Sequence, residues 1–299
     1  ASMADNNQND DWYDYQPGVP VPKHITHLRV GVRQAVEAAA TSGAAPETME
    51  PPDRLCYKHP NLQQVQIHVH SIRNIPCLAF CRSSKLKHVE FVGATTTGTS
   101  PAATGNPQVQ SKLTMIESQA FNACHNLQSV IGLEHASCSL EGIGNGAFWF
   151  CGKLTTLNVS WLKCLHILDS AFFACQSLIV VDLSNSVLLE EIGSSTFSDC
   201  TALKIIHLPP NLKRINVQAF RNCQSLVSIV IPTLVEHIGH QTFWTCCGLT
   251  KVTFQSTRHL RTLLNGSLFS GEQFLGCTAL HTLELQGRTI PRKLWPLLL

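Results

Sequence analysis

Three pairs of residues in this sequence have side chains of the kind that bind metals or carry out redox chemistry. They are Cys77 with Cys81, Cys246 with Cys247, and His68 with His70. Zinc sites use paired Cys or Cys/His knuckles that converge from two loops, and Cys77 and Cys81 have no second knuckle at a suitable spacing. The alternation of His68 and His70 is explained more simply by an exposed strand end. We therefore predict no metal site and no cofactor.

A nucleophilic mechanism is not indicated either. It would need a cysteine or serine within hydrogen-bonding reach of a base, together with a site for the oxyanion. The 14 histidines are scattered, and the phosphate-loop pattern Gly-x-x-x-x-Gly-Lys-Ser is absent. We predict no catalytic residue, and an enzyme or metalloprotein with a site carried on the fold is the less favoured alternative.

Most of the cysteines belong instead to a repeated pattern. Its clearest copy, Leu212–Ile231, reads Leu-x-x-Ile-x-x-x-Ala-Phe-x-x-Cys-x-x-Leu-x-x-Ile-x-Ile. The marker phenylalanines are Phe80, Phe121, Phe148, Phe172, Phe197, Phe220, Phe243 and Phe274, with gaps of 41, 27, 24, 25, 23, 23 and 31 residues. A recurring period in this range indicates a solenoid of stacked repeats.

Each position of the repeat predicts a local structure. The Ala-Phe-x-x-Cys segment is too short for an independent helix, so we predict a single helical turn there. The following Leu-x-x-Val-x-Leu predicts a short strand. The cysteines three residues after the marker are Cys124, Cys151, Cys175, Cys200, Cys223, Cys246 and Cys277. Stacking places these seven thiols in one column, which we predict to be buried and reduced.

These residues resemble the BspA-like (Treponema-type) leucine-rich repeats, over roughly Leu55 to Leu285 and most closely from Leu113 to Phe254. The resemblance implies an α/β fold: a curved right-handed leucine-rich-repeat solenoid with one parallel strand sheet on one face and short helical turns on the other. It also implies a role in adhesion or protein–protein interaction rather than catalysis.

The rest of the chain divides around this solenoid. We predict a disordered segment at 1–18, an N-terminal capping region at 19–54, the solenoid at 55–289 and the start of a truncated C-terminal cap at 290–299. The solenoid contains an insert at 93–108 that has low complexity and no large apolar residue, so we expect it to be flexible.

Composition limits the partners. The 22 basic and 20 acidic residues give a net charge of +2 at pH 7, which argues against a dedicated nucleic-acid surface. The sequence contains no run of about 18 apolar residues, so we predict no membrane-spanning helix. The polar N-terminus is unlike a secretory signal. We therefore expect a cytoplasmic, monomeric scaffold that binds a protein, with a cell-surface adhesin as the alternative if an upstream signal has been removed.

The residues on either side of the central strand position should point away from the core. In the flanking repeats they are polar: Gln64, Gln66, His88, Glu90, Lys251, Thr253, Thr282 and Glu284. In three central repeats Val180, Ile205 and Val230 take such positions, on strands stacked about 4.8 Å apart. The predicted partner site is Thr156, Asn158, Val180, Asp182, Ile205, His207, Ser228 and Val230.

Two alternatives to this site remain open. Strand propensity alone favours β-branched residues at these positions. The opposite, turn-bearing face could bind instead through Trp149 and Phe173, although these two rings in adjacent repeats are expected to pack on each other.

The insert gives a direct test of the domain organisation. Deleting most of residues 93–108 should hardly change the melting temperature, because the segment offers no apolar anchor and because the entropy of loop closure varies only slowly with loop length. Thermal unfolding of the shortened and full-length chains measures this. A large fall in melting temperature would show that the insert packs on the solenoid.

Overall fold

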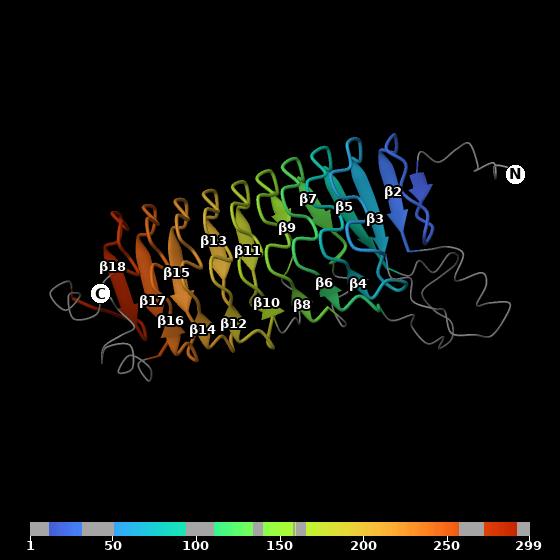
Figure 1. Ribbon diagram of the computed structural model, residues 1–299. Helices are drawn as coiled ribbons and strands as arrows, with labels where there is room; N and C mark the ends of the chain where they lie inside the picture. Colours follow the sequence, from blue (N-terminus) through green and yellow to red (C-terminus); the bar gives the residue numbers. More distant parts are fainter. Residues whose placement is uncertain are drawn as a thin grey trace, which may run out of the picture.

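The computed structural model describes residues 12–31, 51–93, 111–133, 140–157, 159, 166–256 and 272–291. Most of the predicted capping region, nearly all of the 93–108 insert and most of 290–299 lie outside these residues. Within them the repeats lie side by side along one elongated body, with the chain passing from one end to the other (Figure 1).

The predicted strands lie in one row along the body, which their hydrogen bonding divides into sheets of six, two and four strands. In spatial order, the first part contains β1 (Trp12–Asp14), β2 (His27–Val30), β3 (Gln64–His68), β5 (His88–Val92), β7 (Ser129–Ile131) and β9 (Thr156–Leu157). It continues through the pair β11 (Val180–Asp182) and β13 (Ile205–His207) to β15 (Ser228–Ile231), β17 (Lys251–Phe254), β18 (Thr282–Leu285) and β19 (Arg288–Thr289). We call this row of strands the first sheet (Figure 1).

A second parallel sheet runs beside the first, and the sequence did not predict it. Its two-residue strands are β4 (Asn74–Ile75), β6 (Met115–Ile116), β8 (Gly142–Ile143), β10 (His166–Ile167), β12 (Glu191–Ile192), β14 (Arg214–Ile215) and β16 (His237–Ile238). Each ends on the buried aliphatic residue five before the marker phenylalanine, and those residues pair in register, as Ile192 does with Ile215. Every repeat with both strands therefore contributes to two sheets.

The predicted helical turns are wrong, since no α-helix occurs among the described residues. In the Phe121 repeat, the N–H of Asn122 donates to Gln119 O within the turn at 3.1 Å, whereas the N–H of Phe121 donates to Ala147 O of the next repeat at 2.8 Å. Gln119 and Ala123 have φ of 57° and 56°, in the left-handed region. An α-helix has neither left-handed residues nor amides shared with a neighbouring segment.

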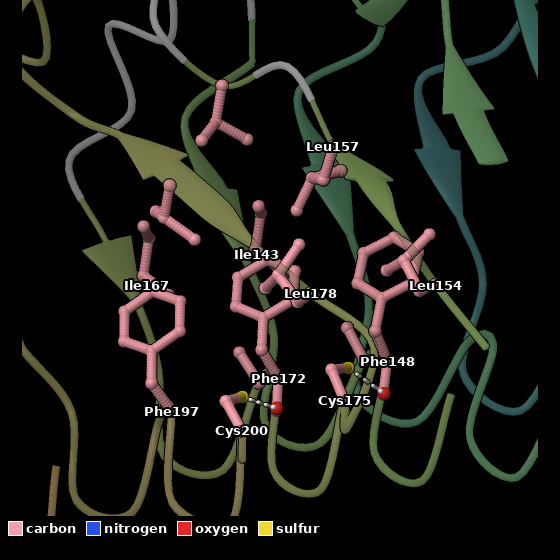
Figure 2. Packing of buried hydrophobic residues seen from close by; sticks show 14 of the residues in the cluster. Ile143, Phe148, Leu154, Leu157, Ile167, Phe172, Cys175, Leu178, Phe197 and Cys200 are labelled. Atoms are coloured by element: carbon pink, nitrogen blue, oxygen red, sulfur yellow. Dashed lines mark hydrogen bonds between the residues drawn. The ribbon is translucent and has the colours of Figure 1, made fainter. Parts of the chain in front are cut away.

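The marker phenylalanines form one continuous stack through the core. Consecutive rings from Phe80 to Phe274 lie 5.1–5.6 Å apart, with interplanar angles of 3–11°. Figure 2 shows three of these rings with the isoleucines and leucines that surround them. The stack holds across the 41-residue and 31-residue gaps as well, so the long insertions leave the repeat geometry unchanged.

Six of the seven column cysteines are buried as predicted, Cys277 is half-buried, and each thiol has a defined partner. The Sγ of Cys175 lies 3.3 Å from Phe148 O of the preceding repeat, and the Sγ of Cys200 lies 3.2 Å from Phe172 O (Figure 2). The same hydrogen bond, from the thiol to the carbonyl of the preceding marker phenylalanine, recurs at Cys124, Cys151, Cys223, Cys246 and Cys277. All eleven described cysteines are free. Cysteine suits this position because it fills a small apolar site and still offers a weak donor to a carbonyl.

The two ends of the solenoid are finished differently. At the N-terminal end β1 pairs in parallel with β2, and Tyr15 is 3% exposed. Residues 12–14 of the segment 1–18 thus belong to the first sheet, and residues 1–11 lie outside the described part of the chain. At the other end β19 pairs with β18 in the antiparallel sense.

The cysteine column predicts unequal effects for two substitutions of Cys175. Cys175→Ala should lower the free energy of unfolding by about 1–2 kcal/mol, because it leaves a small void and removes the bond to Phe148 O. Cys175→Ser should cost clearly less, because Ser83 already occupies the equivalent position and donates to Cys56 O at 2.7 Å. Denaturant unfolding of both variants measures the difference, and equal losses would contradict a role for this hydrogen bond.

Candidate functional site

The outward face of the first sheet has the register that the repeat predicts. Val180 pairs with Ile205 and Asp182 pairs with His207 on the adjacent strands β11 and β13. The residues between them, such as Ile206, are buried. The alternation along each strand confirms that the predicted site residues on β11 and β13 point away from the core.

At the N-terminal end of this face the polar side chains bond to one another. Arg29 lies 3.7 Å from the Asp14 carboxylate and donates to Gln66 at 3.2 Å. Gln66 in turn donates to Glu90 at 2.8 Å. Four strands are thereby linked by one polar chain, and these groups can satisfy their hydrogen bonds without a partner.

The C-terminal end of the face is similar. Lys251 forms an ion pair with Glu284 at 2.8 Å, and the Thr253 hydroxyl lies 3.3 Å from the same carboxylate. The strands at the two ends of the first sheet thus present polar side chains that pair with one another, and Ile131 on β7 is a separate exposed apolar residue.

The centre of the face is apolar and exposed. Val180, Ile205 and Val230 are 43%, 47% and 46% exposed. Val180, Ile205 and Ser228 each lie two residues after the buried leucine of their repeat. Val230 lies four residues after that leucine, as do Asp182 and His207. The predicted strip therefore runs obliquely across three strands instead of forming one straight row.

Two further apolar residues belong to this surface and were missed. Ile179 and Val227 are 43% and 51% exposed, and each directly follows the buried leucine of its repeat. The sequence did contain the signal, because the same position in neighbouring repeats holds Lys204 and Thr250. We call Ile179, Val180, Ile205, Val227 and Val230 the central apolar patch.

The remaining predicted site residues are placed unevenly. Thr156 lies in β9 opposite Ser129, at the N-terminal side of the patch. Asn158 lies outside the described residues. Ser228 is exposed and pairs with Lys251, so it joins the patch to the polar C-terminal flank.

The polar rim of the patch carries a fixed negative charge. The Asp182 carboxylate accepts a hydrogen bond from the Ser184 N–H at 2.9 Å. Desolvation raises the pKa of this carboxyl, but the hydrogen bonds from Ser184 and the nearby His207 outweigh it, so the pKa lies below its usual range. Asp182 is therefore ionised at neutral pH.

The second sheet presents a charged surface in the same repeats. Arg214 donates to Glu191 at 2.6 Å and Lys213 pairs with Glu190 at 2.8 Å. Hydrogen bonds from Arg214 and Asn216 hold the pKa of Glu191 below its usual range. Exposed pairs of this kind contribute little to stability, but they distinguish this surface from the first sheet.

The candidate metal ligands do not assemble into a site in the described part of the chain. No group of three or more His, Cys, Asp or Glu side chains there could hold a metal ion. The rings of His68 and His70 lie 5.8 Å apart, and burial lowers the pKa of both imidazoles. Cys246 belongs to the buried column, whereas Cys247 is exposed.

The alternative aromatic pair on the turns is in contact, as expected. Trp149 and Phe173 meet edge to face with ring centroids 5.9 Å apart, and Phe150 packs against both. The described part of the chain contains no helix long and apolar enough to cross a membrane.

The protein is a leucine-rich-repeat solenoid. This class is defined by the two rows of parallel strands, the phenylalanine stack and the repeat of about 23 residues. The sequence pattern of the BspA type leucine rich repeat region matches six copies, over residues 50–160, 103–189 and 188–287. The chain therefore belongs to the BspA-type leucine-rich-repeat family.

Solved structures of bacterial leucine-rich-repeat proteins are similar to this chain. A leucine-rich repeat protein from Bacteroides ovatus is 23% identical with a TM-score of 0.49, over 79% of this chain and 64% of its own. The T. pallidum leucine-rich repeat protein TpLRR is 22% identical with a TM-score of 0.39, over 80% of this chain and 74% of its own.

A leucine-rich cell surface protein from Faecalibacterium prausnitzii is 17% identical with a TM-score of 0.30, over 84% of this chain and 85% of its own. The match to the Bacteroides ovatus protein covers 64% of that protein, so this chain spans less than two thirds of its length. No curated protein matches the chain.

The cysteines of the described residues should differ sharply in reactivity. Burial raises the pKa of the Cys56 and Cys175 thiols to about 12, so almost no thiolate forms at neutral pH. A water-soluble maleimide should label Cys247 in the folded protein, and the six fully buried thiols of the column, Cys124 to Cys246, only after denaturation.

Peptide mapping by mass spectrometry identifies the labelled positions, and Cys247→Ser is the control that removes the fast site. Labelling of Cys175 at the rate of Cys247 in the folded protein would contradict a buried column.

Proposed function

We propose that this protein is a non-catalytic scaffold that binds a protein partner through the central apolar patch on the first sheet. The observation that carries the proposal is the exposure of five large aliphatic side chains on, or directly before, the strands β11, β13 and β15. They lie between two ends of the sheet whose polar groups are already paired. A contiguous apolar surface with a polar rim is typical of an interaction site.

The rim supplies features that would select among partners. Asp182 is a fixed acceptor, and His207 is exposed beside it on β13. Lys204 is exposed next to Ile205. A partner that covers the patch would place its own polar groups opposite these residues, because an unpaired charge at the edge of a buried apolar contact is costly.

We also propose that the protein resides in a compartment that keeps thiols reduced. The eleven free cysteines support it, since a chain with so many unpaired thiols suits a compartment that keeps thiols reduced. Disulfides in protein isolated from its native source would argue against this location.

The anchor of the patch is Ile205, which lies on the middle strand of the three. Ile205→Asp should weaken partner capture by at least about 30-fold, the equivalent of about 2 kcal/mol, because a charge replaces an apolar contact at the centre of the interface. The fold should be retained, because Ile205 is 47% exposed and no core position changes.

Capture from an extract of the native source, followed by titration of the captured protein, measures this effect. Val217→Asp is the matched control: Val217 is 44% exposed but follows β14 of the second sheet, and Asp169 stands at the equivalent position of another repeat. Partner capture unaffected by Ile205→Asp would show that the patch is not the site, and unfolding of that variant would show that Ile205 is part of the core.

A further inference from the structure

A depression lies on the turns, away from both sheets. Its volume is about 490 Å³, and it is lined by Arg82, Ser84, Asn122, Ala123, His125, Trp149 and Phe150. The residues two after the marker phenylalanine form a row along the turns: Arg82, Ala123 and Phe150 occupy it in three successive repeats. The depression arises there because the small Ala123 stands between two large side chains.

One wall of the depression is cationic and uncompensated. No acidic residue lines it, and the Arg82 guanidinium has no ion-pair or hydrogen-bond partner among the described residues. A guanidinium offers five N–H donors in a planar fork that matches a carboxylate.

The opposite wall is aromatic and rigid. Phe150 is 43% exposed and stacks on Trp149, with ring centroids 5.4 Å apart and an interplanar angle of 14°. Phe173 meets the edge of Phe150 at 5.6 Å, and His125 Nδ1 lies 3.1 Å from the Phe150 carbonyl. These contacts fix an exposed ring in one orientation facing the depression.

The repeat imposes the backbone conformation at Phe150, and the unusual feature is the size of the side chain placed there. The φ of Phe150 is 60°, in the left-handed region, where a bulky aromatic residue is unusual. Other repeats place Ala174, Asp199, Asn222 and Thr245 at this row position, all smaller. Among the described residues, the buried Trp149 Nε1 has no hydrogen-bond partner.

We propose that this depression binds a carboxylate joined to an aromatic body, with the carboxylate on Arg82 and the ring against Phe150. The distance between the two walls follows from the repeat: they stand two repeats apart, roughly 10 Å at a strand spacing of about 4.8 Å. A ring bearing a short carboxylate arm spans that distance over Ala123. The chemistry is shared by a small aromatic acid and by the C-terminal residue of a peptide that ends in phenylalanine.

The repeats themselves indicate which substitutions the backbone accepts. Phe150→Ala and Arg82→Gln should leave the backbone unchanged, because alanine and glutamine already adopt this left-handed φ at Ala123 and Gln119. Ala123→Asp and Ala123→Asn form a matched pair that differs only in charge, and Asp199 and Asn222 hold these residues at the equivalent positions of other repeats. Thermal unfolding verifies that each variant is folded.

The probes are phenylacetate, its neutral analogue phenylacetamide, and the peptide Gly-Gly-Phe with a free or an amidated C-terminus. Titration followed by ligand-observed NMR should show saturable binding of phenylacetate or of the free peptide. Binding should weaken at least about tenfold in the neutral analogues and in Arg82→Gln, Phe150→Ala and Ala123→Asp, because each removes or opposes one of the two contacts. Ala123→Asn should be affected much less, and Arg73→Gln, which removes an exposed charge near β4, should have no effect.

The relative affinity of the probes identifies the source of the ligand. Tighter binding of the free peptide assigns the site to a chain terminus, and tighter binding of phenylacetate assigns it to a small aromatic acid. The proposal is overturned by the absence of saturable binding at millimolar concentrations of both carboxylates, by equal binding of the neutral analogues, or by equal losses in Ala123→Asp and Ala123→Asn. The Ile205→Asp variant should bind these probes normally, so the outcome is independent of the central apolar patch.

Discussion

The structure depends on how the backbone N–H groups of each turn are shared between two kinds of acceptor, carbonyls of the same turn and carbonyls of the next repeat. Within each Ala-Phe-x-x-Cys segment, alternate N–H groups donate inside the turn and to the carbonyls of the next repeat, as Asn122 and Phe121 do. This pattern requires left-handed residues at fixed points, and it brings the marker rings to a stacking distance of 5.1–5.6 Å. A single repeat lacks both the acceptors and the second ring surface, so each repeat is stable only beside its neighbours.

The sequence predicted the residues of the core far better than the backbone that joins them. The markers, the column cysteines and the outward positions on β11 and β13 were identified, because period and alternation follow directly from which side chains are buried. The second sheet was missed because two-residue strands such as Glu191–Ile192 are too short to show alternation. The sequence predicts helical turns here because Gln119 and Ala123 adopt a left-handed φ without the glycine that usually indicates one.

The two surfaces with a proposed role illustrate the same limit. The central apolar patch could be found because a valine or isoleucine at an outward position departs from the polar flanks, although Ile179 and Val227 were overlooked just outside the strands. The depression beside Phe150 could not be found, because it results from one small residue between two large ones in different repeats. Only the stacking of the turns brings Arg82 and Phe150 to opposite sides of Ala123.

The reversal of direction at the last strand limits how the molecules can assemble. Every other ladder of the first sheet is parallel, so a free edge in that sense would accept the first strand of another copy and extend the array without end. The antiparallel β19, with Arg288 and Thr289 both exposed, occupies that edge instead. The edge of β18 is therefore already occupied, and another parallel strand cannot pair with it directly.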